Sequence, residues 1–174
     1  MNVIRSIHHL DVFLFMWVAS RKTQNRLVKI AKAVSKSANG PLYLFLMLGL
    51  AARNHGTDSL FLGSLLLGFA LERPIYFVLK NLFRRNRPYV ALNTQNFVTP
   101  GDRFSFPSGH TSAAFLVATV TSSFTPSLTP MIFGWASLVG MARVVLGVHF
   151  PTDTLIGALM GTGLALISME TLVQ

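Results

Sequence analysis

Three short polar segments carry the side chains best suited to catalysis, and the first is Lys80-Asn-Leu-Phe-Arg-Arg-Asn-Arg87-Pro88. If a helix continues past Lys80, the spacing of seven places Lys80 and Arg87 on one face, about 10 Å apart along the axis. Pro88 disfavours helix at Arg87, so we expect the chain to turn there. Two converging cations predict a clamp for an anion, and arginine offers a bidentate fork to phosphate oxygens. A basic cluster that only sets membrane topology is the alternative.

The second segment, Phe106-Pro-Ser108-Gly109-His110-Thr-Ser112, opens an apolar stretch with the signals of a helix start. Serine is a favoured N-cap residue, and glycine permits close approach of another group to the backbone. Free N–H groups at a helix N-terminus bind phosphate without any charged side chain. His110 would stand beside such an anion, able to give or take a proton near neutral pH. A capped helix with a purely structural histidine is the alternative.

The third segment is Arg143-Val-Val-Leu-Gly-Val-His149-Phe-Pro-Thr-Asp153. Its glycine and proline are helix-stop signals, so we expect His149 in a short turn between two helices. Asp153 can accept a hydrogen bond from one ring nitrogen of His149 and leave the other nitrogen as a nucleophile, the arrangement of an activated nucleophile and its orienting group. An interfacial histidine followed by a helix-start aspartate is the structural alternative.

In the order Lys-x6-Arg-Pro, Pro-Ser-Gly-His and Arg-x5-His-x3-Asp, the segments resemble the type 2 phosphatidic acid phosphatase family. The resemblance is to its membrane-embedded lipid phosphatase branch, which includes bacterial phosphatidylglycerophosphate and undecaprenyl diphosphate phosphatases, and its motif core covers residues 80–153. Soluble haloperoxidases share these motifs, but the apolar content of this chain argues against that branch. The family often has serine before the third-segment arginine. Ala142 stands there in this chain and removes one potential hydrogen bond to phosphate.

The resemblance implies a role for each matching residue. His149 attacks phosphorus to form a phosphohistidine, Asp153 orients it, and His110 protonates the leaving oxygen and then activates water. The phosphate oxygens are held by Lys80, Arg87, Ser108, Gly109 and Arg143. The resemblance also implies that no cofactor and no metal take part, and the sequence contains no Asp-x-Asp, His-Glu-x-x-His or Walker loop.

Two further ionisable residues, Glu72 and Arg73, lie inside an apolar stretch eight and seven residues before Lys80. Charged groups inside a membrane are costly, so a functional role near the site is the default interpretation. We therefore treat the two residues as possible supports of the phosphate-binding groups. Equally, Glu72 and Arg73 can be interpreted as a purely structural ion pair whose charged ends extend toward the membrane surface.

The composition shows what must position these segments. The 174 residues are 51% apolar and only 12% charged, with a mean hydropathy of +0.51, whereas soluble domains carry about 25% charged residues. We therefore expect an integral membrane protein. In a membrane protein, a net charge of +9 can fix the orientation of the helices and attract anionic headgroups. We expect no nucleic-acid partner, because no soluble domain is large enough to present a basic face. With no cysteine, disulfides and thiolate chemistry are excluded.

A membrane-spanning helix needs about 20 mostly apolar residues. Five stretches qualify, the fifth only with its flanking residues: 58–80, 108–124, 128–148, 152–172 and 41–52. A sixth candidate, 12–19, is short and follows several polar residues. Residues 21–36 alternate six cations with apolar residues and predict a basic amphipathic helix on the membrane surface. We therefore expect one all-α domain over residues 1–174, a polytopic bundle of five or six transmembrane helices with this basic segment near its N-terminus.

The expected activity is hydrolysis of a phosphate monoester or diphosphate on a membrane lipid: phosphatidate, phosphatidylglycerophosphate, undecaprenyl diphosphate or a lipid A phosphate. The headgroup and the oligomeric state stay open. A lipid phosphotransferase using the same intermediate is the alternative within the class. A small anion transporter or channel is the alternative from another class, although it gives no reason for two histidines with these partners.

Two arguments on sidedness oppose each other in a multi-pass protein of the bacterial inner membrane. Residues 21–36 and 81–105 are separated by two spans and share one face, whose cations place the site in the cytoplasm by the positive-inside rule. Family members often act on the periplasmic side with six spans, which requires 12–19 to span. We favour the periplasmic side, where lipid phosphates destined for recycling are released. Besides the presumed catalytic cations, the shared face carries Arg21, Lys22, Arg26, Lys29, Lys32, Lys36, Arg84, Arg85 and Arg103.

Overall fold

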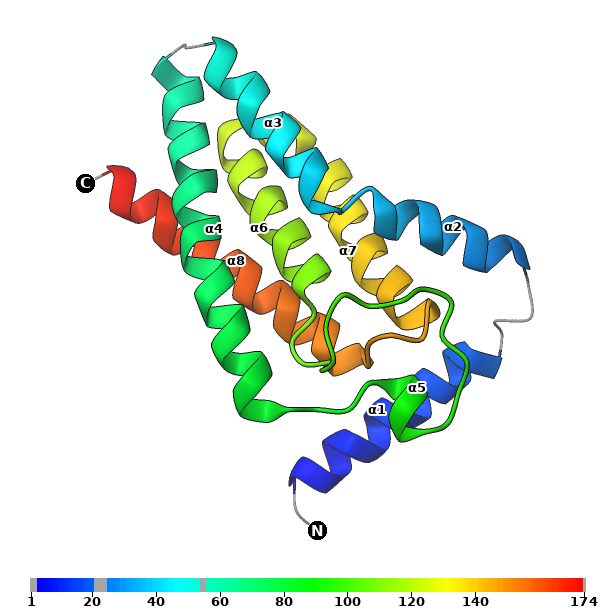
Figure 1. The fold of residues 1–174 in the computed structure, drawn as a ribbon. Helices are drawn as coiled ribbons and strands as arrows, with labels where there is room; N and C mark the ends of the chain where they lie inside the picture. The colour runs from blue at the N-terminus through cyan, green and yellow to red at the C-terminus, as the bar shows by residue number, and fades with distance from the viewer. Residues whose placement is uncertain (1–2, 21–24, 54–55, 174) are drawn as a thin grey trace.

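The computed structural model describes residues 3–20, 25–53 and 56–173, and every regular element in these ranges is helical (Figure 1). This confirms the all-α expectation for the described part of the chain. The helices are α1 (Val3–Ser20), α2 (Asn25–Lys36), α3 (Gly40–Arg53), α4 (Gly56–Phe83), α5 (Pro88–Ala91), α6 (Gly109–Phe124), the 3-10 turn η1 (Pro126–Leu128), α7 (Thr129–Val145) and α8 (Pro151–Val173).

Helices α3, α4, α6, α7 and α8 form a bundle with α6 near its centre (Figure 1). Helix α6 packs against α4, α7 and α8, and its contact with α8 is the most extensive in the described chain. Ala114, Leu116 and Ala118 of α6 are completely buried. The helix ends before Pro126, which opens the η1 turn into α7. The uncharged segment between these two helices thus returns the chain at the end of the bundle opposite the three polar segments.

Three helical segments of the described chain are long and apolar enough to cross a membrane: Ser59–Ala91, Pro126–Val145 and Pro151–Leu172. They correspond to three of the expected spans. Gly40–Gly49 is a shorter apolar helix, and α6, with 16 residues, is short because it starts inside the bundle beside the polar segments. The protein is therefore a membrane-helix bundle, and the number of five or six spans stays a prediction.

The two N-terminal helices lie at the end of the bundle that carries the polar segments (Figure 1). Asp11 of α1 is buried and its Oδ1 accepts a hydrogen bond from the Thr152 backbone N–H at 2.9 Å. Phe15 of α1 packs edge-on against Phe150, with ring centroids 5.6 Å apart. Helix α2 buries Val28 and Ala31 in an apolar cluster with the end of α7, and the described basic residues of α2 are exposed. Arg21 and Lys22 lie outside the described residues.

Two glycines of α8 allow its close approach to α6. A Cβ on Gly157 would lie 2.6 Å from the Ser108 carbonyl oxygen, and one on Gly161 would overlap the Ser112 carbonyl oxygen. Both obstacles are backbone atoms, which cannot move aside as a side-chain tip can. The glycine pair therefore serves packing within the chain, and it sets the distance between the helices that carry the second and third polar segments.

We expect Gly161→Ala to destabilise the protein by about 1–3 kcal/mol or more, because the added methyl group forces α8 away from α6. Gly163→Ala is the matched control on the same helix, since its Cβ would meet nothing within 4 Å. Thermal unfolding of the purified proteins in one detergent measures the difference. Equal melting temperatures for the two variants would contradict the packing role of Gly161.

Candidate active site

The three polar segments meet at one end of the bundle, each placed by a different pair of elements. Lys80 lies in the last turn of α4, Ser108 precedes α6, and His149 lies in the turn between α7 and α8. The expectation that Lys80 and Arg87 share a helical face is wrong, because α4 ends at Phe83. Arg87 instead has extended backbone (φ −70°, ψ 153°) just before Pro88, as the proline effect predicted.

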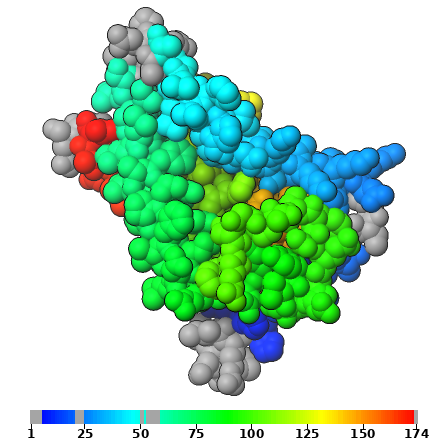
Figure 2. Space-filling model, in the orientation of Figure 1, coloured from blue at the N-terminus to red at the C-terminus, as the bar shows by residue number. Residues whose placement is uncertain are grey.

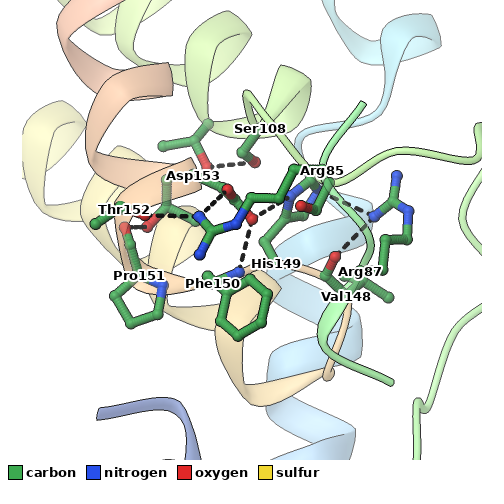
Figure 3. Close-up of polar contacts among 12 residues, drawn as sticks. Arg85, Arg87, Ser108, Val148, His149, Phe150, Pro151, Thr152 and Asp153 are labelled. Atoms are coloured by element: carbon green, nitrogen blue, oxygen red, sulfur yellow. Dashed lines mark hydrogen bonds and ion pairs between the residues drawn. The ribbon is translucent and has the colours of Figure 1, made fainter. Parts of the chain in front are cut away.

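The Arg87 guanidinium is 1% exposed and lies beside His149 (Figure 3). Its Nη1 donates a hydrogen bond to the Val148 carbonyl oxygen at 2.8 Å and lies 3.4 Å from His149 Nε2. Its Nε donates to the Asp102 carbonyl oxygen at 3.2 Å. The backbone on both sides of the site therefore fixes the guanidinium directly next to a ring nitrogen of His149.

The Asp102 carboxylate joins the two cations of the first segment. Its Oδ1 lies 2.5 Å from Arg87 Nη2 and 2.8 Å from Lys80 Nζ. Its Oδ2 accepts a hydrogen bond from the Tyr76 hydroxyl at 2.5 Å, and Lys80 donates to that hydroxyl at 2.6 Å. Burial alone would raise the pKa of Asp102, but the hydrogen bonds from Lys80 and Tyr76 and the two positive charges outweigh burial and lower the pKa to about 2.

Asp102 and Tyr76 were not predicted as site residues. The sequence placed Asp102 only in a long polar interval, and Tyr76 carries no signal beyond its position four residues before Lys80 on the same helix. That spacing puts the two α4 side chains on one face, and it could have suggested their contact.

His149 is buried between Arg87 and Asp153 (Figure 3). Its Nδ1 lies 3.7 Å from Asp153 Oδ2, longer than a hydrogen bond, and has no hydrogen-bond partner among the described residues. Burial lowers the pKa of His149 to about 4, although the nearby Asp153 raises it in part. The imidazole is therefore neutral at physiological pH, which is the form a nucleophile needs.

Two neighbours hold Asp153 in place. Its Oδ2 accepts a hydrogen bond from the Phe150 N–H at 2.8 Å, and its Oδ1 accepts one from Arg85 Nη1 at 2.8 Å. Arg85 also donates to Thr152 Oγ1 at 2.8 Å, pairs with Asp11 of α1 at 2.5 Å, and lies 4.2 Å from the centre of the Phe150 ring (Figure 3). The sequence placed Arg85 among the charges that set topology. The structure places it beneath Asp153, linking α1 to the site.

The second segment presents backbone and histidine groups at the start of α6. Ser108 is the N-cap residue, as expected, but its hydroxyl lies 2.9 Å from Thr111 Oγ1 and does not cap the helix. A Cβ on Gly109 would lie 2.8 Å from the Tyr76 ring, so glycine is required for this approach. His110 Nε2 lies 3.0 Å from the Asn39 amide oxygen.

Arg143 enters the site from the last turn of α7 and is 6% exposed. Its Nη1 donates a hydrogen bond to Ser35 Oγ of α2 at 2.8 Å, while its Nε is buried without a partner among the described residues. The preceding Ala142 packs in the apolar cluster with Val28 and Ala31. A small apolar side chain at this position therefore suits the packing of α2 on α7.

Glu72 and Arg73 lie on α4, about two turns before Lys80. The Glu72 side chain is fully buried and pairs with Arg73, whose side chain is 46% exposed. Among the described residues, no group of three or more histidine, aspartate or glutamate side chains is arranged to hold a metal ion. Lys80, Arg87 and Arg143 are buried cations at this end of the bundle.

The chain is similar to several phosphatases of known name. It is 41% identical over 86 residues to decaprenylphosphoryl-5-phosphoribose phosphatase of Mycolicibacterium smegmatis, which covers 46% of this chain and 43% of the relative. The chain spans from about a third to two thirds of the length of the curated relatives it matches.

Two solved structures share its fold. LpxE of Aquifex aeolicus superposes with a TM-score of 0.83 and 30% identity, covering 92% of this chain and 95% of that one. A transmembrane PAP2-type phosphatidylglycerolphosphate phosphatase of Bacillus subtilis superposes with a TM-score of 0.79 and 26% identity. The superposition covers 95% of this chain and 86% of that one. The family model of the PAP2 superfamily matches residues 61–173, which hold all three polar segments. The chain therefore belongs to the PAP2 superfamily.

Proposed function

We propose that the protein is an integral membrane lipid phosphatase that hydrolyses a phosphate monoester or diphosphate through a phosphohistidine. The observation that carries the proposal is the buried His149, held between the Arg87 guanidinium at 3.4 Å and the Asp153 carboxylate at 3.7 Å. The names of its relatives support the same chemistry: a phosphatidylglycerophosphatase of Bacillus subtilis and an undecaprenyl-diphosphatase of Sulfolobus acidocaldarius are among them.

In the proposed first step, His149 Nε2 attacks phosphorus, because Nδ1 faces Asp153. Asp153 then stabilises the positive ring, and Arg85 holds Asp153 in the orientation that this requires. The bond from phosphorus to the lipid oxygen breaks, and His110 gives that oxygen a proton. In the second step, a water molecule gives its proton to His110 and attacks the phosphohistidine, which releases inorganic phosphate and restores His149.

Five groups are proposed to bind the phosphate oxygens. Lys80, Arg87 and Arg143 supply positive charge where negative charge develops in the transition state. Ser108 and Gly109 supply the start of α6, where backbone N–H groups favour an anion. The unpartnered, buried Nε of Arg143 is a donor that a phosphate oxygen would satisfy. Because these side chains provide the neutralising charge, we propose a reaction without metal or cofactor.

We propose that the incoming phosphate replaces the Asp102 carboxylate. That carboxylate pairs with both Lys80 and Arg87, and a phosphate would present oxygens to the same two groups. Asp102 lies on the loop between α5 and α6, with its side chain 39% exposed, so it has solvent to turn toward. Its charge thus competes with every anion that enters the site.

The membrane arrangement completes the proposal. We propose five spans, α3, α4, α6, α7 and α8, with α1 and α2 on the membrane surface beside the active site. We further propose that this surface faces the periplasm. The positive-inside rule opposes that orientation, and binding of the exposed α2 cations to anionic headgroups offsets part of the bias. The substrate is a membrane lipid such as phosphatidate, phosphatidylglycerophosphate, undecaprenyl diphosphate or a lipid A phosphate.

The reaction is tested with purified protein and a panel of these lipids in buffer that contains EDTA. We expect release of inorganic phosphate, a loss of about a thousandfold or more in His149→Ala, and label trapped on His149 when turnover is stopped under denaturing alkaline conditions. His9→Ala, which removes an exposed histidine of α1, is the control. Full activity of His149→Ala, or an absolute need for magnesium, would refute the mechanism.

Vanadate binding tests the role of Asp102. We expect Asp102→Asn to bind vanadate roughly threefold to tenfold more tightly than the wild type, because a partly exposed competing charge is removed. Asp102→Glu, which keeps the charge, is the control and should stay within about twofold of the wild type. Weaker vanadate binding by Asp102→Asn would show that the carboxylate positions Lys80 and Arg87 for the anion and does not compete with it.

The chain has no cysteine, so single cysteines can report sidedness. Asn25 and Gln95 are exposed near the active site, and Ser127 is exposed in the η1 turn at the opposite end. We expect a membrane-impermeant thiol reagent to label Asn25→Cys and Gln95→Cys in intact cells, and Ser127→Cys only after lysis. Ser6→Cys, at the exposed start of α1, should be labelled in intact cells like Asn25→Cys and Gln95→Cys. The reverse pattern would place the site in the cytoplasm, and Ser6→Cys following Ser127→Cys would mean that α1 spans.

A further inference from the structure

A cavity of about 520 Å³ opens between α3, α4 and α6 beside the proposed catalytic histidines. Its polar end is formed by Arg73, Asp102 and His110, and its walls include Tyr43 and Phe69. In the space-filling view, α6 is visible at the bottom of a hollow between α3, α4 and the loop that precedes α6 (Figure 2). The cavity is large enough for a headgroup, and the catalytic chemistry proposed above uses only its His110 end.

Arg73 lies in this cavity at a fixed distance from Lys80. The two residues are seven positions apart on α4, which is about 10 Å along the helix axis. Tyr76 lies between them in the sequence. The Arg73 guanidinium carbon is 4.9 Å from the centre of that ring, and Lys80 Nζ is 4.5 Å from the same centre. The two charges are therefore at most about 9.4 Å apart, on one face of the helix.

Glu72 orients the Arg73 side chain. The Nε and Nη2 groups of Arg73 both contact Glu72 Oε2, and Nη1 has no partner among the described residues. Glu72 itself is fully buried, and its other oxygen has no hydrogen-bond partner in the described chain. A buried carboxylate inside an apolar helix is costly. Here its visible effect is to hold a guanidinium at the cavity with one donor group free.

We propose that Arg73 binds the lipid-linked phosphate of a lipid diphosphate and thereby makes the site selective for diphosphates over monophosphates. This inference rests on the proposed phosphatase function. The terminal phosphate would lie among Lys80, Arg87 and Arg143, and the bridging oxygen would lie near His110. A diphosphate that accepts a hydrogen bond of about 2.9 Å at each end is long enough to bridge Lys80 and Arg73. The lipid chain would continue along the apolar walls of the cavity.

The proposal gives Arg73 a role in bond breaking. When His149 attacks the terminal phosphorus, the bond from phosphorus to the bridging oxygen breaks, and its electrons remain on the lipid monophosphate that leaves. His110 protonates that oxygen, and Arg73 stabilises the remaining negative charge. Water then hydrolyses the phosphohistidine, so one water is consumed and lipid monophosphate and inorganic phosphate are formed. A lipid monophosphate releases an uncharged alcohol, which leaves Arg73 with no phosphate to bind.

The test uses two lipids with the same polyprenyl chain, one a diphosphate and one a monophosphate, in mixed micelles. We expect the wild type to prefer the diphosphate, and Arg73→Gln to lower the ratio of the two kcat/KM values tenfold or more, as loss of a charge-assisted hydrogen bond predicts. Arg73→Lys keeps the charge and should restore part of the preference. Arg103→Gln, which removes an exposed cation of the loop, is the control and should leave the ratio unchanged.

Each other outcome has a separate meaning. An equal loss on both lipids in Arg73→Gln, or no loss on either, overturns the inference, because Arg73 would then be structural or irrelevant. A wild type that cleaves only the monophosphate overturns it too and leaves the phosphatase function intact. A wild type that cleaves neither polyprenyl lipid overturns the inference, and the proposed function fails with it only if the protein also releases no phosphate from the other lipids of the panel and traps no label on His149. If Arg73→Gln fails to fold, the ratio measured for Arg73→Lys decides: a ratio equal to that of the wild type overturns the inference.

Discussion

The structure depends on one constraint: a charge buried in an apolar bundle is costly unless opposite charges or hydrogen bonds compensate for the water it has lost. Lys80 and Arg87 satisfy this constraint by sharing the carboxylate of Asp102. Arg85 satisfies it by pairing with Asp153 and Asp11. The two networks lie on opposite sides of His149. In the proposed mechanism a phosphate replaces the carboxylate of the first network, and the carboxylate of the second network stays in place.

This division follows from where each carboxylate sits. Asp153 is completely buried at the start of α8, bonded to the Phe150 N–H and to Arg85. The Asp153 carbonyl oxygen also accepts a hydrogen bond from the Ser108 N–H at 3.0 Å, which ties the start of α8 to the start of α6. That bond requires the close helix contact that Gly157 and Gly161 permit. Asp102 has no such anchor for its side chain beyond the cations and a tyrosine, and it reaches solvent.

The sequence predicted the parts of this site whose signal is local. Residue type and spacing identified His149, the proline turn after Arg87, and the helix start at Ser108, because caps, stops and turns are properties of neighbouring residues. It did not predict Asp102, or the pairing of Arg85 with Asp11, because these contacts join residues far apart in the chain. Two adjacent arginines in one basic run have no local feature that assigns one to a carboxylate network and the other to the surface. Only the packing of α1 and α8 distinguishes them.

The same reasoning applies to the α4 face, to which we assign a role in substrate choice. Arg73, Tyr76 and Lys80 follow one another on that face, and the ring lies within 5 Å of both charges. Each charge has its own carboxylate, Glu72 for Arg73 and Asp102 for Lys80. The Glu72 side chain is fully buried, and its charge offsets part of the charge of Arg73. The Asp102 side chain is partly exposed, and in the proposed mechanism the full charge of Lys80 becomes available when an anion takes its place. The available charge would then increase along α4 from Arg73 to Lys80, which favours a substrate whose more highly charged end lies at the proposed nucleophile.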